Sequence, residues 1–165
     1  MEITWHGENS LTIKGNKATV LVDPKELKEG VADAVVSTTE HADHKGLRVF
    51  DWPGEYEVKG VPIVNMRVFT APKDDKSAKE TLISKFEVDG VKFCHLGDLG
   101  HSIADDMSDK IGDVDVLIAP VEGNLKMKVL QTIIDKIEPR AILPVNYASL
   151  AGFLKEMSVG NVEAE

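Results

Sequence analysis

The sequence predicts an α+β protein in which β-sheets carry helices on their outer faces. Short runs rich in β-branched residues and separated by glycine-containing turns extend from the N-terminus to Leu96. Beyond residue 100 the pattern changes to helical runs that alternate with continuous apolar runs. Asp89-Gly90, flanked by two apolar runs, is the strongest short-range hairpin signal in the chain. Together these patterns indicate antiparallel sheet first and β-α-β units afterwards.

The expected strands are short and end at recognisable stops. The run at 18–23 ends at Asp23-Pro24, where proline stops a strand because it has no N–H to donate. The apolar run that begins at Ala34 leads directly into a histidine-rich segment. The polar residues 70–79 are expected to form a surface loop. The predicted strands are residues 2–5, 10–14, 18–23, 34–38, 81–88 and 91–96, together with a loosely alternating run at 54–67 that has glycines at its bends.

The last third of the chain contains the expected helices. Within residues 125–137, Leu125, Val129, Ile133 and Ile137 recur every four residues, so they form one apolar stripe on a helix. Pro139 ends this helix. Two further helices are expected at 103–111 and 148–157, with buried strands at 114–119 and 141–145. The helices at 125–137 and near the C-terminus are predicted to lie outside the sheets.

Composition limits the class of protein. The 165 residues fit one domain spanning 1–165, and no apolar run approaches the roughly 20 residues of a membrane helix. The formal net charge of −9 disfavours a nucleic-acid partner, because phosphate backbones repel an acidic surface. A single cysteine, Cys94, excludes an internal disulfide and is typical of a reducing compartment. We expect a cytoplasmic protein with no membrane partner.

A histidine-rich segment, residues 37–44, is the first candidate for chemistry. His41, Asp43 and His44 follow a buried strand, and imidazole and carboxylate are the ligands that divalent metals such as zinc prefer. Neighbours on a strand point to opposite faces, so these side chains converge only if the chain turns over the strand end. A solvated polar loop with chance histidines explains the same residues. The segment by itself leaves both readings open.

Two other strand ends carry polar residues. Asp98 lies between Gly97 and Gly100 at the end of an apolar run, and these glycines allow a tight turn that brings the carboxylate close to a ligand. A strand-to-helix turn in which Asp98 only binds nearby N–H groups is the alternative. Asn146 and Tyr147 close another buried strand. Polar tips of this kind are where α/β-type sheets assemble sites.

Taken in order, these segments resemble the metallo-β-lactamase superfamily, in a bacterial branch of zinc-dependent hydrolases. The resemblance covers nearly the whole chain. It implies a compact four-layer αββα sandwich with a metal site at the edge between two β-sheets. The matching blocks are Ile3-Thr4-Trp5 with Gly7, Leu21-Val22-Asp23-Pro24, Thr38-x-x-His41-x-Asp43-His44, residues 53–60, His95 to His101, residues 114–117, and Glu138-Pro139 through Tyr147.

The chain departs from the family pattern at three metal ligands. Thr39 stands at the first histidine of the family's His-x-His-x-Asp-His signature, and Asn146 at the histidine of its last turn. A third histidine is expected midway along the chain, yet none occurs between His44 and His95. The resemblance therefore leaves His41, Asp43, His44 and Asp98 as metal ligands, with Asn146 offering an amide oxygen. It implies one zinc or other divalent ion, or none, rather than a two-metal centre.

Two functions remain open from the sequence. In the first, a metal-dependent hydrolase acts on a small-molecule ester, lactone, amide or phosphoester, with Asp43 or Asp98 as the catalytic base. In the second, a non-catalytic relative has lost its metal and serves as a binding or assembly module. His95 is expected to be a satisfied core histidine, since it lies in an apolar strand. Substrate, metal identity and oligomeric state stay open.

Overall fold

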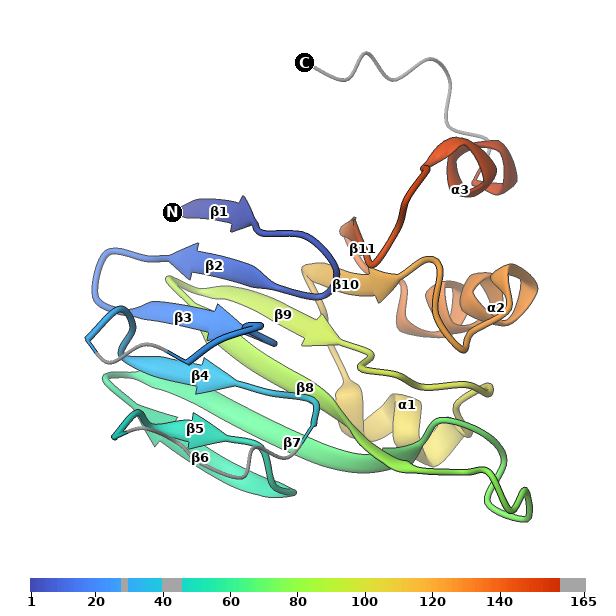
Figure 1. Ribbon diagram of the computed structural model, residues 1–165, viewed down its shortest axis with the longest axis horizontal. Helices are drawn as coiled ribbons and strands as arrows, with labels where there is room; N and C mark the ends of the chain where they lie inside the picture. The colour runs from blue at the N-terminus through green and yellow to red at the C-terminus, as the bar shows by residue number, and fades with distance from the viewer. Residues whose placement is uncertain (28–29, 40–45, 158–165) are drawn as a thin grey trace.

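Two β-sheets stacked face to face form the body of the molecule. The computed structural model describes residues 1–27, 30–39 and 46–157 (Figure 1). Five strands form the first sheet in the order β1-β2-β3-β4-β5. The antiparallel strands β1 to β3 are followed by parallel pairs between β3 and β4 and between β4 and β5. The strands are β1 (Glu2–Trp5), β2 (Leu11–Lys14), β3 (Thr19–Val22), β4 (Ala34–Val36) and β5 (Val49–Phe50).

The second sheet has six strands in the order β11-β10-β9-β8-β7-β6. Strands β6, β7, β8 and β9 pair in turn as antiparallel neighbours, whereas β9, β10 and β11 run parallel. Asp89 and Gly90 both have positive φ angles and connect β8 to β9, as the Asp-Gly signal predicts. The strands are β6 (Gly54–Val58), β7 (Val61–Phe69), β8 (Glu80–Val88), β9 (Val91–His95), β10 (Val116–Pro120) and β11 (Ala141–Val145).

The space between the sheets is an apolar core. Alternate residues of β2 and β3 face alternate residues of β7, β8 and β9, because side chains on a strand point to opposite faces in turn. Phe86 and Phe93 are neighbours across β8 and β9 and stack with ring centroids 5.3 Å apart. This layer includes Leu11, Ile13, Val20, Val22, Ile63, Phe86 and Phe93, all less than 2% exposed.

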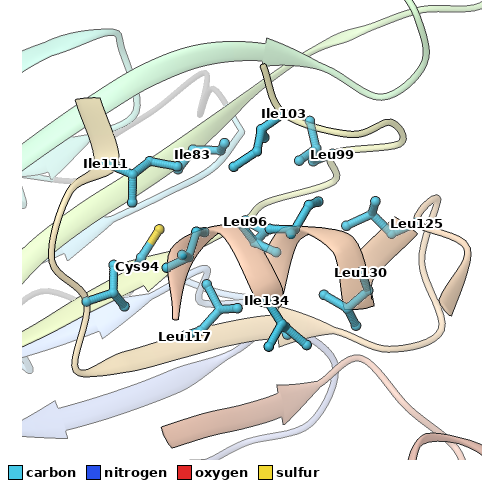
Figure 2. Packing of buried hydrophobic residues seen from close by; sticks show 14 of the residues in the cluster. Ile83, Cys94, Leu96, Leu99, Ile103, Ile111, Leu117, Leu125, Leu130 and Ile134 are labelled. Carbon is cyan, nitrogen blue, oxygen red and sulfur yellow. The ribbon is translucent and has the colours of Figure 1, made fainter. Parts of the chain in front are cut away.

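Helices cover the outer face of the six-stranded sheet. They are α1 (Asp105–Ile111), α2 (Met127–Ile137) and α3 (Ala151–Glu156), all packed on a second apolar core. Figure 2 shows Leu130 and Ile134 of α2 beside Leu117 of β10 and Leu96, which follows β9. The expected location of residues 125–137 and the C-terminal helix outside the sheets is confirmed. Within the described residues, loops containing Leu27 and Leu47 cover the outer face of the five-stranded sheet.

The two-sheet prediction is confirmed, and among the described residues the helices of the expected αββα sandwich lie on the six-stranded sheet alone. The other differences are local. The run at 54–67, in which glycines were expected to mark bends, is a hairpin of β6 and β7, because Lys59 and Gly60 both have positive φ angles and turn the chain. The short strand β5 was not predicted, since two residues carry no alternation pattern. Helices α1, α2 and α3 begin two to three residues later than predicted. Among the described residues, no helix is long and apolar enough to span a membrane.

Candidate functional site

The ends of four strands meet at one edge of the sandwich and surround a hollow of about 340 Å³. Asp23 follows β3, Thr38 and Thr39 follow β4, Asp98 follows β9, and Asn146 follows β11. These ends lie together because β3 and β4 run parallel in one sheet, while β9 and β11 run parallel in the other. Glu8, Asn9 and Lys25 complete the lining.

Thr38 connects the two sheets beneath this hollow. Its carbonyl oxygen accepts hydrogen bonds from the Leu82 N–H at 3.0 Å and from the Thr81 hydroxyl at 3.1 Å. The Thr81 oxygen in turn accepts the Asp98 N–H at 3.2 Å. Thr81 is 2% exposed, so these bonds form away from competing water. The turn after β4 and the turn that carries Asp98 are therefore tied to the same residue of β8.

Gly97 allows the Asp98 turn to approach that junction. Its φ angle is +57°, in the left-handed region that favours glycine. A Cβ at this position would lie 2.3 Å from the Leu82 carbonyl oxygen and 2.8 Å from the Thr81 hydroxyl oxygen. Glycine is therefore needed at Gly97 both for its conformation and for the close contact with β8.

The Asp23 carboxylate holds the turn after β4. It accepts the Thr38 N–H and the Thr38 hydroxyl, each at 2.6 Å, and the Ser37 hydroxyl at 3.2 Å. Its side chain is only 11% exposed. Short hydrogen bonds to an ionised acceptor in such surroundings are stronger than those between neutral groups. Asp23 therefore fixes the first residues of the segment that leads to His41.

Backbone strain concentrates around the same hollow. Glu8, Asp23 and Asn146 all have positive φ angles between 39° and 52°, and all three line it. Residues held in this sparsely populated region cost free energy and cluster at functional sites. The Asn146 N–H donates to the Glu8 carbonyl at 2.8 Å, and the Trp5 indole N–H donates to the same oxygen at 2.9 Å. Asn146 is thus anchored to the loop after β1.

Among the sequence-predicted site residues, Asp98 and Asn146 come together in the hollow. His41, Asp43 and His44 lie outside the described residues. Within residues 1–27, 30–39 and 46–157, no three His, Cys, Asp or Glu side chains form a group that could hold a metal ion. The described lining still supplies oxygen donors, since the Asn146 amide nitrogen donates to the Glu122 carbonyl and leaves its Oδ1 for other contacts. Carboxylate and amide oxygens suit a divalent cation.

Several lining residues were not predicted as part of the site. Asp23 was interpreted only as a strand stop, although Asp-Pro after a buried strand could have marked a polar tip. Lys25 forms an ion pair with Glu8 at 2.9 Å, and nothing in their spacing links them. His6 and His101 make only local contacts in the described residues: His6 Nε2 contacts the Thr12 hydroxyl at 2.7 Å, and His101 Nδ1 contacts the Ser102 carbonyl at 2.8 Å.

A smaller hollow of about 110 Å³ shares Thr38 and Thr39 with the first. Its wall includes Trp52, which is 56% exposed, and Arg67, whose guanidinium lies 5.4 Å from the indole centroid. Arg67 also pairs with Glu80 at 3.2 Å. An exposed indole beside a guanidinium offers a flat surface for an organic group.

Comparisons with known proteins agree with this architecture. Residues 2–146 match the family model of the β-lactamase superfamily domain. A Thermotoga maritima structure described as a zinc-dependent hydrolase of the metallo-β-lactamase superfamily is 28% identical, with a TM-score of 0.75. That match covers 93% of this chain and 84% of the Thermotoga chain. No curated protein matches the sequence significantly.

More distant structures share the fold alone. One is described as a metal-dependent hydrolase from Parabacteroides distasonis, with 16% identity, a TM-score of 0.67, and 96% of this chain and 88% of that chain covered. Another is described as a metal-dependent hydrolase from Veillonella parvula, with 13% identity, a TM-score of 0.69, and 93% and 92% covered. Each chain is aligned over most of its length, so the likeness extends over the whole two-sheet body.

Proposed function

We propose, because the chain belongs to the metallo-β-lactamase superfamily, that it is a metal-dependent hydrolase with one exchangeable divalent ion. The observation that carries this proposal is the meeting of Asp98 and Asn146 in a strained, polar hollow at the sheet edge. Thr39 lines that hollow as well, so the segment that bears His41, Asp43 and His44 starts there. Asp43, His44 and Asp98 would hold the ion, with His41 and the Asn146 amide oxygen as further donors.

A bound divalent ion would supply a water of lowered pKa and polarise the group under attack. The chain's own residues have distinct roles. The backbone N–H of Asp98 donates to the Thr81 hydroxyl oxygen, so the turn that carries the Asp98 carboxylate is fixed before any ligand arrives. Asp43 or Asp98 would accept the proton of the attacking water. Lys25 can attract an anionic group of the substrate, and the Trp52 surface can hold an organic portion.

A second candidate is a binding module that has lost catalysis. The substitutions at the ligand positions favour it, because Thr39 and Asn146 stand where the family has histidines. Each loss removes a coordinate bond and leaves water in its place. In this case the hollow would bind its ligand through hydrogen bonds from Thr39, Lys25 and Asn146 without hydrolysis.

A hydrolysis screen separates the two candidates. Purified protein would be supplied with zinc, manganese or no metal and assayed against chromogenic esters, lactones, amides and phosphoesters. The hydrolase predicts turnover that requires metal and falls at least about tenfold in Asp98→Asn. Asp113→Asn is the matched control, since Asp113 is an exposed aspartate paired only with Lys92 at 3.3 Å in the described structure. Equal turnover in Asp98→Asn and the control would contradict a catalytic or metal role for Asp98.

A further inference from the structure

His95 is a buried imidazole that neither proposed function uses. It ends β9 with no exposed surface and lies three residues before Asp98. Its strand position alternates with that of Cys94, so its side chain faces the space between the sheets, as Phe93 does. Cys94 instead belongs to the outer core beneath the helices. A titratable ring in the inner layer requires a physical explanation, because polar groups are costly to bury without partners.

One hydrogen bond identifies the tautomer of the ring. The Gly97 N–H donates to His95 Nδ1 at 2.7 Å, so Nδ1 must be unprotonated. Burial lowers the pKa of His95 more than the nearby carboxylates of Asp23 and Asp98 raise it. The ring is therefore neutral near pH 7, and its proton lies on Nε2.

The protonated nitrogen is nearest a carboxylate that positions the site. His95 Nε2 lies 3.5 Å from Asp23 Oδ2. It has no hydrogen-bond partner within the described parts of the chain. A hydrogen bond of this type is usually about 2.7–3.2 Å long, so a shift of a few tenths of an ångström completes it. The same Asp23 oxygen accepts the Thr38 hydroxyl at 2.6 Å.

We propose that His95 is a positioning residue that couples the two turns bearing the metal ligands. On one side, its Nε2–H donates to Asp23, which holds Thr38 at the start of the segment leading to His41, Asp43 and His44. On the other side, its Nδ1 accepts the Gly97 N–H and fixes the turn that presents Asp98. The planar ring keeps these two contacts at a constant separation. The ligand roles of these residues rest on the proposed function, whereas the coupling itself does not.

Two substitutions of His95 each remove one of its two contacts and keep the other. The Asn side-chain oxygen occupies about the position of Nδ1, so His95→Asn keeps an acceptor for Gly97 and loses the donor to Asp23. The Gln amide reaches about the position of Nε2, so His95→Gln keeps the donor and loses the acceptor. Ser84→Ala is the matched control, because Ser84 is the buried cross-strand neighbour of His95 and contacts neither turn through a described bond.

The readout is amide NMR of the metal-free protein, independent of any hydrolase activity. We expect His95→Asn to move the Thr38 amide resonance and leave Gly97 in place. We expect the reverse for His95→Gln and no change at either amide for Ser84→Ala. An unmoved Thr38 amide in His95→Asn, or equal movement of both amides in the two variants, would overturn the proposal. Wild-type ring-nitrogen shifts provide a test that needs no variant: protonation on Nδ1, or on both nitrogens, near pH 7 would also overturn it.

A zinc titration then connects the coupling to the metal site. Both His95 variants should bind zinc about 10–100-fold more weakly than wild type, as is typical when the residues that orient metal ligands are removed. Wild-type-like affinity in both variants would contradict the positioning role. A wild-type protein that binds no zinc would contradict the proposed function instead, and the amide result would still decide the coupling.

Discussion

Substituting Gly97 by alanine tests the junction on which the site is built. The residue has a φ angle of +57°, where an L-residue pays about 1–2 kcal/mol. The new Cβ would also lie 2.3 Å from the Leu82 carbonyl oxygen and 3.1 Å from Thr38 Cβ. Forcing such contacts apart typically costs about 1–3 kcal/mol more. We therefore expect Gly97→Ala to lower the free energy of unfolding by about 2–5 kcal/mol, measured by urea denaturation.

Gly90→Ala is the matched control for this measurement. Gly90 has a φ angle of +81°, so alanine suffers similar backbone strain there, but nothing lies within 4 Å of its added Cβ. Gly90→Ala should therefore lower the free energy of unfolding by only about 1–2 kcal/mol. The difference between the two variants isolates the steric contact at the junction. If both variants lose the same free energy within about 0.5 kcal/mol, the reasoning about the junction is refuted.

Four further predictions concern single residues. Asp23→Asn should lower the free energy of unfolding by about 2 kcal/mol in urea denaturation, because the two 2.6 Å bonds from Thr38 lose their charged acceptor; a loss below about 0.5 kcal/mol would contradict this. Because the pKa of His95 is lowered in the folded protein, the His95 ring of the unfolded chain takes up a proton at a higher pH, as the pH falls below about 6.5. Stability should therefore fall below that pH by up to about 1.4 kcal/mol per pH unit, and chemical denaturation of His95→Asn should show a flatter dependence. Burial raises the pKa of the Cys94 thiol to about 12, so a thiol reagent should label it only after unfolding, and rapid native labelling would refute the burial. Asn146→His should raise zinc affinity at least about tenfold in a competition titration, because it restores an imidazole in the hollow, and unchanged affinity would exclude Asn146 from the metal site.

Much of the fold follows from patterns that a sequence carries locally. Strand runs alternate over a few residues, and α2 shows its apolar stripe at four-residue spacing. The Asp89-Gly90 turn is equally local. Strand β5 is too short for any pattern, and the order of strands in a sheet depends on pairings between distant segments. The bend at Gly60 was expected from its glycine, but a tight hairpin there was not, because a lysine such as Lys59 rarely adopts the left-handed conformation.

The site was predictable only where polar residues follow strands. Asp98 and Asn146 were identified in this way, and the structure brings them into one hollow. The contact of His95 with Asp23 joins residues 72 positions apart, from strands in different sheets, and no local pattern carries that information. The interpretation of His95 as a satisfied core histidine holds only for Nδ1, because Nε2 has no hydrogen bond within the described residues.

Metal stoichiometry tests the central claim most directly. Purified protein would be dialysed against a mild chelator, titrated with zinc and analysed for metal content, with His44→Ala as the control. We predict one zinc ion per chain that the chelator removes and that returns on titration, and a much weaker site in His44→Ala. Two ions per chain that resist the chelator, or none at millimolar zinc, would contradict a single exchangeable metal site.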